Sequence, residues 1–129
     1  MARFWIGAIA LMALVSVSAT STQGPALDRV MRKKLECAQK ILEAGVTSRW
    51  ADLEAQSKEM DALTNDPGWA VLKMPEYARH SADFRRSVRA LRDAAVTRDL
   101  DAAPQAYAAL TLSCVQCHRY LARERIARQ

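Results

Sequence analysis

The chain has 129 residues, which is enough for one domain with a single core. Half of the residues are hydrophobic, and 19 Lys and Arg against 14 Asp and Glu give a formal net charge of +5. Basic side chains gather at residues 79–92 and 119–128, a pattern that nucleic-acid-binding proteins also show. Residues 1–19 have the pattern of an export signal, which argues against a nucleic-acid partner. The basic side chains are then expected to form a solvated helix face or a surface that attracts an acidic partner.

The first residues, "MARFWIGAIALMALVSVSATSTQG", have the layout of a secretory signal peptide. Arg3 precedes an unbroken run of apolar and small residues over 4–17, and Val17 and Ala19 suit the cleavage site. The run is shorter than the about 20 residues that a membrane span needs, so an uncleaved anchor is the less favoured alternative. We expect a signal peptide over 1–19, cleavage near Ala19, and a mature domain over 20–129 in the periplasm without membrane attachment.

The rest of the chain shows helical periodicity four times and no alternating strand pattern. Gly45 is expected just past the end of the first helix, Thr47 or Ser48 is expected to cap the second, and Asp101 the fourth. Four amphipathic helices with mostly short connections predict an all-α fold, an antiparallel up-down-up-down four-helix bundle without a second domain. The expected helices cover about residues 25–44, 48–64, 75–98 and 102–127.

Each predicted helix carries one apolar stripe, which is expected to face the core. His80 falls one residue off its stripe and is expected to be partly exposed, and Cys37 is expected to be a small, partly buried side chain. The stripes are Met31, Leu35, Ala38 and Leu42 in the first helix, with Val30 and Ile41 beside them; Trp50, Leu53, Ser57, Met60 and Leu63 in the second; Tyr77, Ser81, Phe84, Val88, Leu91 and Ala95 in the third; and Tyr107, Leu110, Cys114, His118 and Leu121 in the fourth.

The last predicted helix contains the segment "SCVQCHRY", in which Cys114, Cys117 and His118 form a C-x-x-C-H motif. Residues three and four apart share a helix face, so the two thiols and the imidazole project together. Thiols at this spacing suit two thioether bonds to one haem, with the His118 imidazole as an axial ligand of the iron. This motif is the signature of c-type haem attachment.

Three alternatives fit the cysteine pair less well. A zinc site needs about four ligands, and only Cys37 or His80 is left to complete the set. A thioredoxin-like redox pair belongs at the start of a helix in a βαβ unit, whereas this pair lies deep inside a helix. A helix that buries two small cysteines without any chemistry is the third alternative. Because the motif, the export signal and the helical setting agree, we expect one covalently bound haem c.

The four helices and the segments "LSCVQCHRY" and "RVMRKKL" resemble the class II cytochromes c, namely the cytochrome c′ and cytochrome c-556 proteins. The resemblance covers about residues 25–127 and implies an electron carrier, not an enzyme, with a redox protein as partner. It implies haem thioethers at Cys114 and Cys117, His118 as the proximal iron ligand, and a homodimer through the first two helices. Cytochromes c′ commonly have an arginine four residues after the haem histidine, and Ala122 at that position favours the c-556-like form.

The ligand on the other side of the iron decides between electron transfer and gas binding. The heights expected in an antiparallel bundle leave Met31, Met60 and His80 open as candidates, whereas Met74 anchors a loop. The resemblance favours Met31, because a methionine in this position of the first helix is the sixth ligand of c-556-like members. An open sixth site would instead give a five-coordinate protein that binds NO or CO. A peroxidase would need distal acid or base groups, and the sequence near Met31 offers only lysines.

Overall fold

The structure, a computed structural model, describes residues 23–127, which form four α-helices and one short 3₁₀ helix. No strand occurs among these residues, so the predicted all-α class is confirmed. The signal peptide predicted over 1–19 lies outside the described residues. The helices are α1 (Gln23–Val46), α2 (Trp50–Ala62), η1 (Leu63–Asn65), α3 (Pro75–Thr97) and α4 (Ala102–Ala127).

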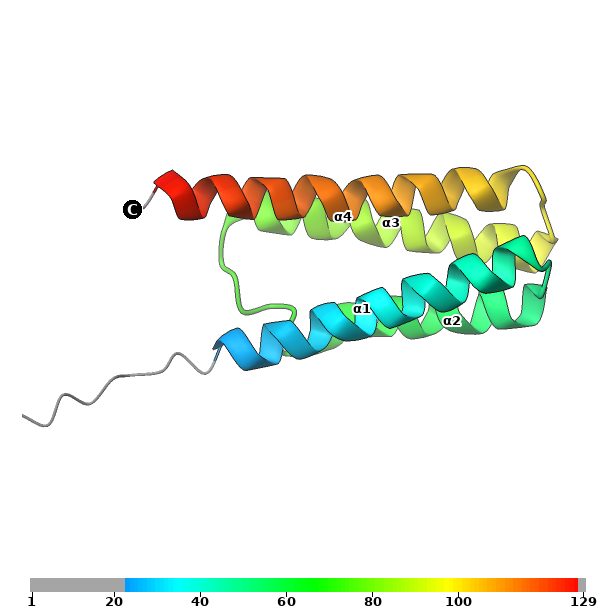
Figure 1. The fold of residues 1–129 in the computed structure, drawn as a ribbon, viewed down its shortest axis with the longest axis horizontal. Coiled ribbons are helices and arrows are strands. Elements are labelled where there is room, and N and C mark those ends of the chain that lie inside the picture. Colours follow the sequence, from blue (N-terminus) through cyan, green and yellow to red (C-terminus); the bar gives the residue numbers. More distant parts are fainter. Residues whose placement is uncertain (1–22, 128–129) are drawn as a thin grey trace, which may run out of the picture.

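The helices pack in chain order. α1 packs on α2, α2 on α3, and α3 on α4, whereas α1 and α4 touch only sparsely. Figure 1 shows the beginning of α1 and the end of α4 at one end of the molecule, and the α1–α2 and α3–α4 connections at the other end. In this view the axes of α1 and α4 diverge toward the former end. The first and last helices of the chain therefore contact each other less than the other neighbouring pairs do.

Buried apolar side chains from all four helices form one core. The stripes predicted for α2 and α3 are largely confirmed, because all their members are buried except Trp50 and Ser81, which are half-buried. In α4 the stripe residue Leu110 is 1% exposed, while Tyr107 and Cys114 are half-buried and pack against the core. The 3.6-residue period thus located the inner faces of the two middle helices correctly.

α1 buries a different face from the predicted one. Leu35 and Leu42 of the predicted stripe are 61% and 47% exposed, and Met31 and Ala38 are half-buried. The apolar surface of α1 is wider than its contact with α2, so a second apolar stripe is left beside α4. The residues of α1 that are buried in the core are Val30, Cys37, Ile41 and Ala44.

The end of α1 differs from the sequence prediction. The helix continues past Gly45, and the chain turns at Ser48, whose φ of 55° lies in the left-handed region. The Thr47 hydroxyl donates a hydrogen bond to the Glu43 carbonyl at 2.6 Å, so it satisfies α1 and does not cap α2. Arg49 occupies the N-cap position of α2, and its side chain forms no capping hydrogen bond. Thr47 was wrongly predicted as a cap because its hydroxyl finds a nearer acceptor.

The start of α4 is capped by Asp99 and not by Asp101. The Asp99 carboxylate accepts hydrogen bonds from the backbone N–H groups of Asp101 and Ala102 at 2.9 and 2.8 Å. These are two of the donors that the first turn of a helix leaves without partners. The cap lies two residues earlier than predicted because the turn after α3 brings Asp99 over the helix start.

The loop between α2 and α3 is held against the beginning of α1. A Cβ atom on Gly68 would lie 2.8 Å from the Ala26 carbonyl oxygen, so this close approach needs glycine. The Asp66 carboxylate accepts the Gly68 N–H at 2.7 Å and pairs with Arg29 of α1 at 3.1 Å. Trp69 follows directly and is 5% exposed. The loop therefore delivers an indole ring to the interior near the divergent end of α1 and α4.

Candidate functional site

Cys114, Cys117 and His118 lie in the second half of α4, as the motif predicted. Both cysteines are half-buried and free of disulfides, and His118 is exposed. Burial raises the pKa of the Cys117 thiol, and the positive charge of Lys34 opposes that rise. The thiols stand one helical turn apart, in the spacing that two attachment points on one ring require.

A cavity of about 550 Å³ lies between α1 and α4, where the second apolar stripe of α1 faces the motif. Its volume falls in the range of about 300–1,000 Å³ that small-molecule and cofactor sites occupy. Most of its walls are apolar. The residues that matter for its chemistry are Met31 and Leu35 of α1, Met60 of α2, Phe84 of α3, and Cys114 and His118 of α4.

A smaller cavity of about 20 Å³ shares several of these walls and includes Cys117. Met31, Cys114 and His118 line both cavities. The structure therefore brings the four residues singled out in the sequence, from two helices at opposite ends of the chain, around one continuous region. The sequence analysis expected Met31 near the motif from bundle heights and the resemblance, and the packing of α1 beside α4 places it on the wall of the same cavity.

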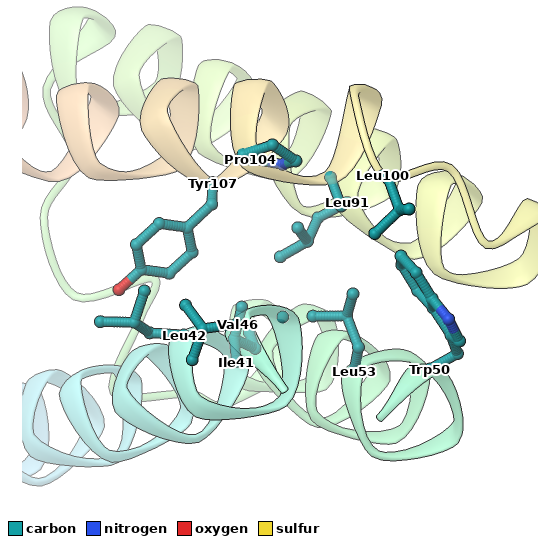
Figure 2. Close-up of a pocket in the computed structure, with 11 residues that line it drawn as sticks. Ile41, Leu42, Val46, Trp50, Leu53, Leu91, Leu100, Pro104 and Tyr107 are labelled. Atoms are coloured by element: carbon teal, nitrogen blue, oxygen red, sulfur yellow. The ribbon is translucent and has the colours of Figure 1, made fainter. Parts of the chain in front are cut away.

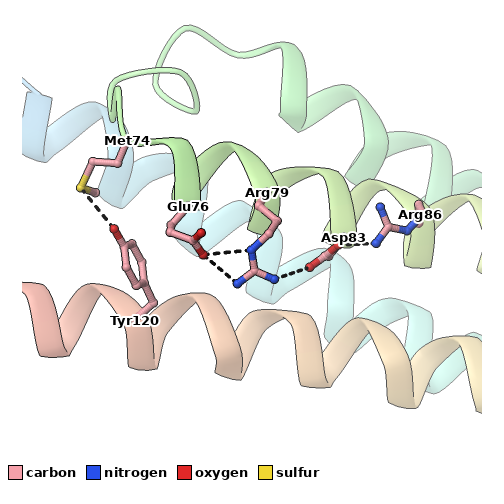
Figure 3. A network of polar contacts seen from close by, with 6 residues as sticks. All are labelled: Met74, Glu76, Arg79, Asp83, Arg86 and Tyr120. Atoms are coloured by element: carbon pink, nitrogen blue, oxygen red, sulfur yellow. Dashed lines mark hydrogen bonds and ion pairs between the residues drawn. The ribbon is translucent and has the colours of Figure 1, made fainter.

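The other candidates for the distal position differ in their surroundings. Met60 lines the larger cavity but is only 1% exposed and belongs to the core. Met74 lines neither cavity, and its sulfur accepts a contact from the Tyr120 hydroxyl at 3.9 Å (Figure 3). His80 lines the smaller cavity. The expectation that His80 is partly exposed is wrong: it is 6% exposed, because the Tyr120 ring packs on it at 5.5 Å.

Lys34 is a residue of this site that the sequence analysis noted only as one of the lysines near Met31. It lines both cavities, and its ammonium group lies 4.2 and 4.0 Å from the ring centroids of Trp69 and Phe84. Burial lowers the pKa of Lys34, while the cysteine thiols act in the opposite direction. Its position three residues after Met31 on one helix face was the available signal. Cation–π contacts compensate part of the cost of burying this charge.

The aromatic residues beside Lys34 are fixed by further contacts. The rings of Trp69 and Phe84 pack at 5.1 Å, and the Tyr77 hydroxyl donates to the Trp69 carbonyl at 2.7 Å. The Trp69 indole N–H donates to Ser81 at 3.1 Å. Burial raises the pKa of Tyr77 to about 12. This cluster closes the smaller cavity with rigid, largely apolar walls.

A separate cavity of about 280 Å³ lies at the other end of the space between α1 and α4. Figure 2 shows Leu42, Trp50, Leu100 and Tyr107 among its walls. It has no charged residue, cysteine, histidine or methionine in its lining. The Tyr107 hydroxyl donates to the Ala38 carbonyl at 3.2 Å and so links α4 to α1. This cavity therefore offers no group that could bind a metal or form a thioether, in contrast to the 550 Å³ cavity and its small neighbour.

Residues 23–127 contain no group of three or more His, Cys, Asp and Glu side chains that could hold a metal ion, including any that would join Cys37 or His80 to the motif. No helix in the described part of the chain is long and apolar enough to cross a membrane. Comparison with known proteins finds no matching family model, curated protein or solved structure. The resemblance to class II cytochromes c stays a prediction from the sequence.

Proposed function

We propose that this protein is a class II c-type cytochrome that carries one covalently bound haem and transfers single electrons. The observation that carries the proposal is the C-x-x-C-H motif of α4 beside a cavity that Met31 also lines. In this proposal the fold is an antiparallel up-down-up-down four-helix bundle over residues 20–129, and α4 is the haem-attachment helix. The packing of helices in chain order supports that arrangement.

The residues around the cavity fit this cofactor. Cys114 and Cys117, two thiols one turn apart, would hold the haem through two thioether bonds. The His118 imidazole and the Met31 thioether, on α1, would be the protein groups available to bind its iron. When bound, haem supplies an iron that changes between the ferric and ferrous states. A soft thioether donor favours the ferrous state and so raises the reduction potential.

The rest of the site adds apolar walls and ordered contacts. Leu35 and Phe84 provide apolar walls, which lower the local dielectric around the cofactor. Trp69 and Tyr77 are tied to each other by a hydrogen bond, so this side of the site changes little between oxidation states. A site that keeps its ligands and shape during reduction suits an electron carrier, which transforms no substrate.

The proposal includes export to the periplasm after cleavage near Ala19, and an acidic redox protein as partner. It also includes a homodimer through α1 and α2. Light scattering of the purified protein tests the dimer, and N-terminal sequencing tests the cleavage site.

Visible spectra of the purified holoprotein test the function. We expect covalent haem, low-spin spectra in both oxidation states, and slow or no CO binding to the reduced protein. The double variant Cys114→Ala with Cys117→Ala should lose covalent haem on a denaturing gel. A high-spin ferric spectrum with ready CO binding would replace the proposal by the five-coordinate gas-binding alternative. A protein without covalent haem after expression with a c-type maturation system would refute both.

A further inference from the structure

A polar groove of about 310 Å³ lies between α3 and α4, behind the motif. Its α4 wall consists of residues at i, i+3, i+4 and i+7, which form one helix face. At 100° per residue, this face points away from Cys114 and His118, with Cys117 at its flank. The groove and the 550 Å³ cavity therefore lie on opposite sides of α4. Its walls are Glu76, Arg79 and His80 of α3, and Gln116, Arg119, Tyr120 and Arg123 of α4.

Two of the three arginines in the groove carry uncompensated charge. Arg79 is held by Glu76 at 2.8 Å and by Asp83 at 3.8 Å, as Figure 3 shows. Arg119 and Arg123 take part in no ion pair among the described residues. They are four residues apart on one face of α4, where like charges repel and destabilise the helix. An anion from outside the chain would remove this repulsion.

His80 gives the groove a second feature that points to a ligand. It is 6% exposed, and its Nδ1 atom has no hydrogen-bond partner among the described residues. A buried polar atom without a partner is costly, and such atoms are rare in folded proteins. His80 lines the groove on one side and the small cavity beside Cys117 on the other. An oxygen acceptor bound in the groove would therefore approach the cofactor region through this ring.

We propose that this groove is the docking surface for an acidic redox protein, whose carboxylates pair with Arg119 and Arg123. This inference rests on the proposed function and identifies where the partner binds. The Cβ atoms of residues four apart on a helix are about 5–6 Å from each other. Arg119 and Arg123 can therefore pair with two neighbouring carboxylates of one partner protein. Complementary charge of this kind raises association rates and orients the partner. The docked partner then lies across the single helix that bears the haem thioethers.

Electron-transfer rates of the holoprotein test the proposal. The reduced protein is mixed in stopped flow with hexacyanoferrate(III), an anionic oxidant, and with tris(phenanthroline)cobalt(III), a cationic one. At low ionic strength, Arg123→Glu should slow the anionic reaction by about three- to ten-fold and accelerate the cationic one. Both effects should vanish at high salt. The control Arg89→Glu makes the same change of charge at an exposed position of α3 outside the groove, and should change both rates less than two-fold.

Chemical-shift mapping of the reduced holoprotein with a short poly-aspartate peptide locates the binding surface. We expect shifts at Gln116, Arg119 and His80 that Arg123→Glu abolishes and Arg89→Glu retains. Equal rate effects of the two variants, or shifts centred on Arg32, which lines the 550 Å³ cavity, would overturn the proposal. The same shifts with inorganic phosphate at equal ionic strength would make the groove a small-anion site and also overturn it. Only proteins with a normal haem spectrum are compared. A failure of the docking proposal is therefore distinct from a failure of the proposed function.

Discussion

Separate replacement of Met31 and Met60 by alanine distinguishes the two methionines that line the larger cavity. Met60 is 1% exposed and lies in the core cluster, whereas Met31 is half-buried and lines both cavities. Met31 is therefore less tightly packed than Met60, although both line the larger cavity. We expect the first variant to change the iron ligation and the second to change the stability.

The expected magnitudes follow from this difference in burial. Truncation of a fully buried methionine to alanine costs about 2–5 kcal/mol, so Met60→Ala should lower the thermal midpoint by roughly 10–25 °C for a loss near 3 kcal/mol. Its ferric spectrum should remain low-spin with the charge-transfer band typical of methionine ligation. Met31→Ala removes little packing, at most about 1 kcal/mol. Its spectrum should become high-spin, and the reduced protein should bind CO.

The two readouts are visible spectroscopy with and without CO, and thermal unfolding of the holoprotein followed by circular dichroism. Loss of the iron–sulfur bond also lowers stability, so the spectrum and not the midpoint identifies the ligand. A Met31→Ala protein that keeps its methionine band would refute the assignment of Met31. If Met60→Ala loses that band, the ligand comes from α2, and the reasoning from the difference in burial is wrong.

Three further predictions concern stability. Gly68→Ala should cost about 1–3 kcal/mol in denaturant unfolding, because the new Cβ atom would lie 2.8 Å from the Ala26 carbonyl oxygen; an unchanged midpoint would mean that the loop shifts without cost. Asp99→Ala should cost about 1 kcal/mol and Asp101→Ala less than half of that, and equal losses would contradict the assignment of the helix cap. Burial raises the pKa of Tyr77 from 10 to about 12, so the folded state holds this proton more tightly than the unfolded state. Stability should therefore fall by about 2–3 kcal/mol as the pH rises from 10 to 12, and Tyr77→Phe should remove that part of the pH dependence.

Local chemistry determined much of the helical structure. The 3.6-residue period, together with Pro75 at the start of α3 and Gly68 in the preceding loop, located the helices because these signals act over a few residues. The spacing of Cys114, Cys117 and His118 on one helix follows from the motif alone for the same reason. The helix caps were harder to predict. The Thr47 hydroxyl has more than one backbone acceptor within reach, and the Asp99 carboxylate has more than one backbone donor.

Tertiary packing decided which of two apolar faces of α1 became core. The sequence offers a stripe through Met31 and one through Val30, and only the contact with α2 selects the second. The face left over lines the cavity beside α4, so the candidate ligand Met31 comes close to the motif through packing and not through periodicity. His80 is buried for a similar reason, because Tyr120, from another helix, covers it.

The sequence by itself therefore determined the helices and the chemistry of the motif, because both depend on neighbours within one or two helical turns. The tertiary structure decided where the cavities lie and that Lys34 lines two of them. It also placed the groove of Arg119 and Arg123 on the side of α4 opposite Cys114 and His118. These features depend on contacts between helices far apart in the chain. Such contacts are selected by the total apolar area and volume that fit together, which no local pattern specifies.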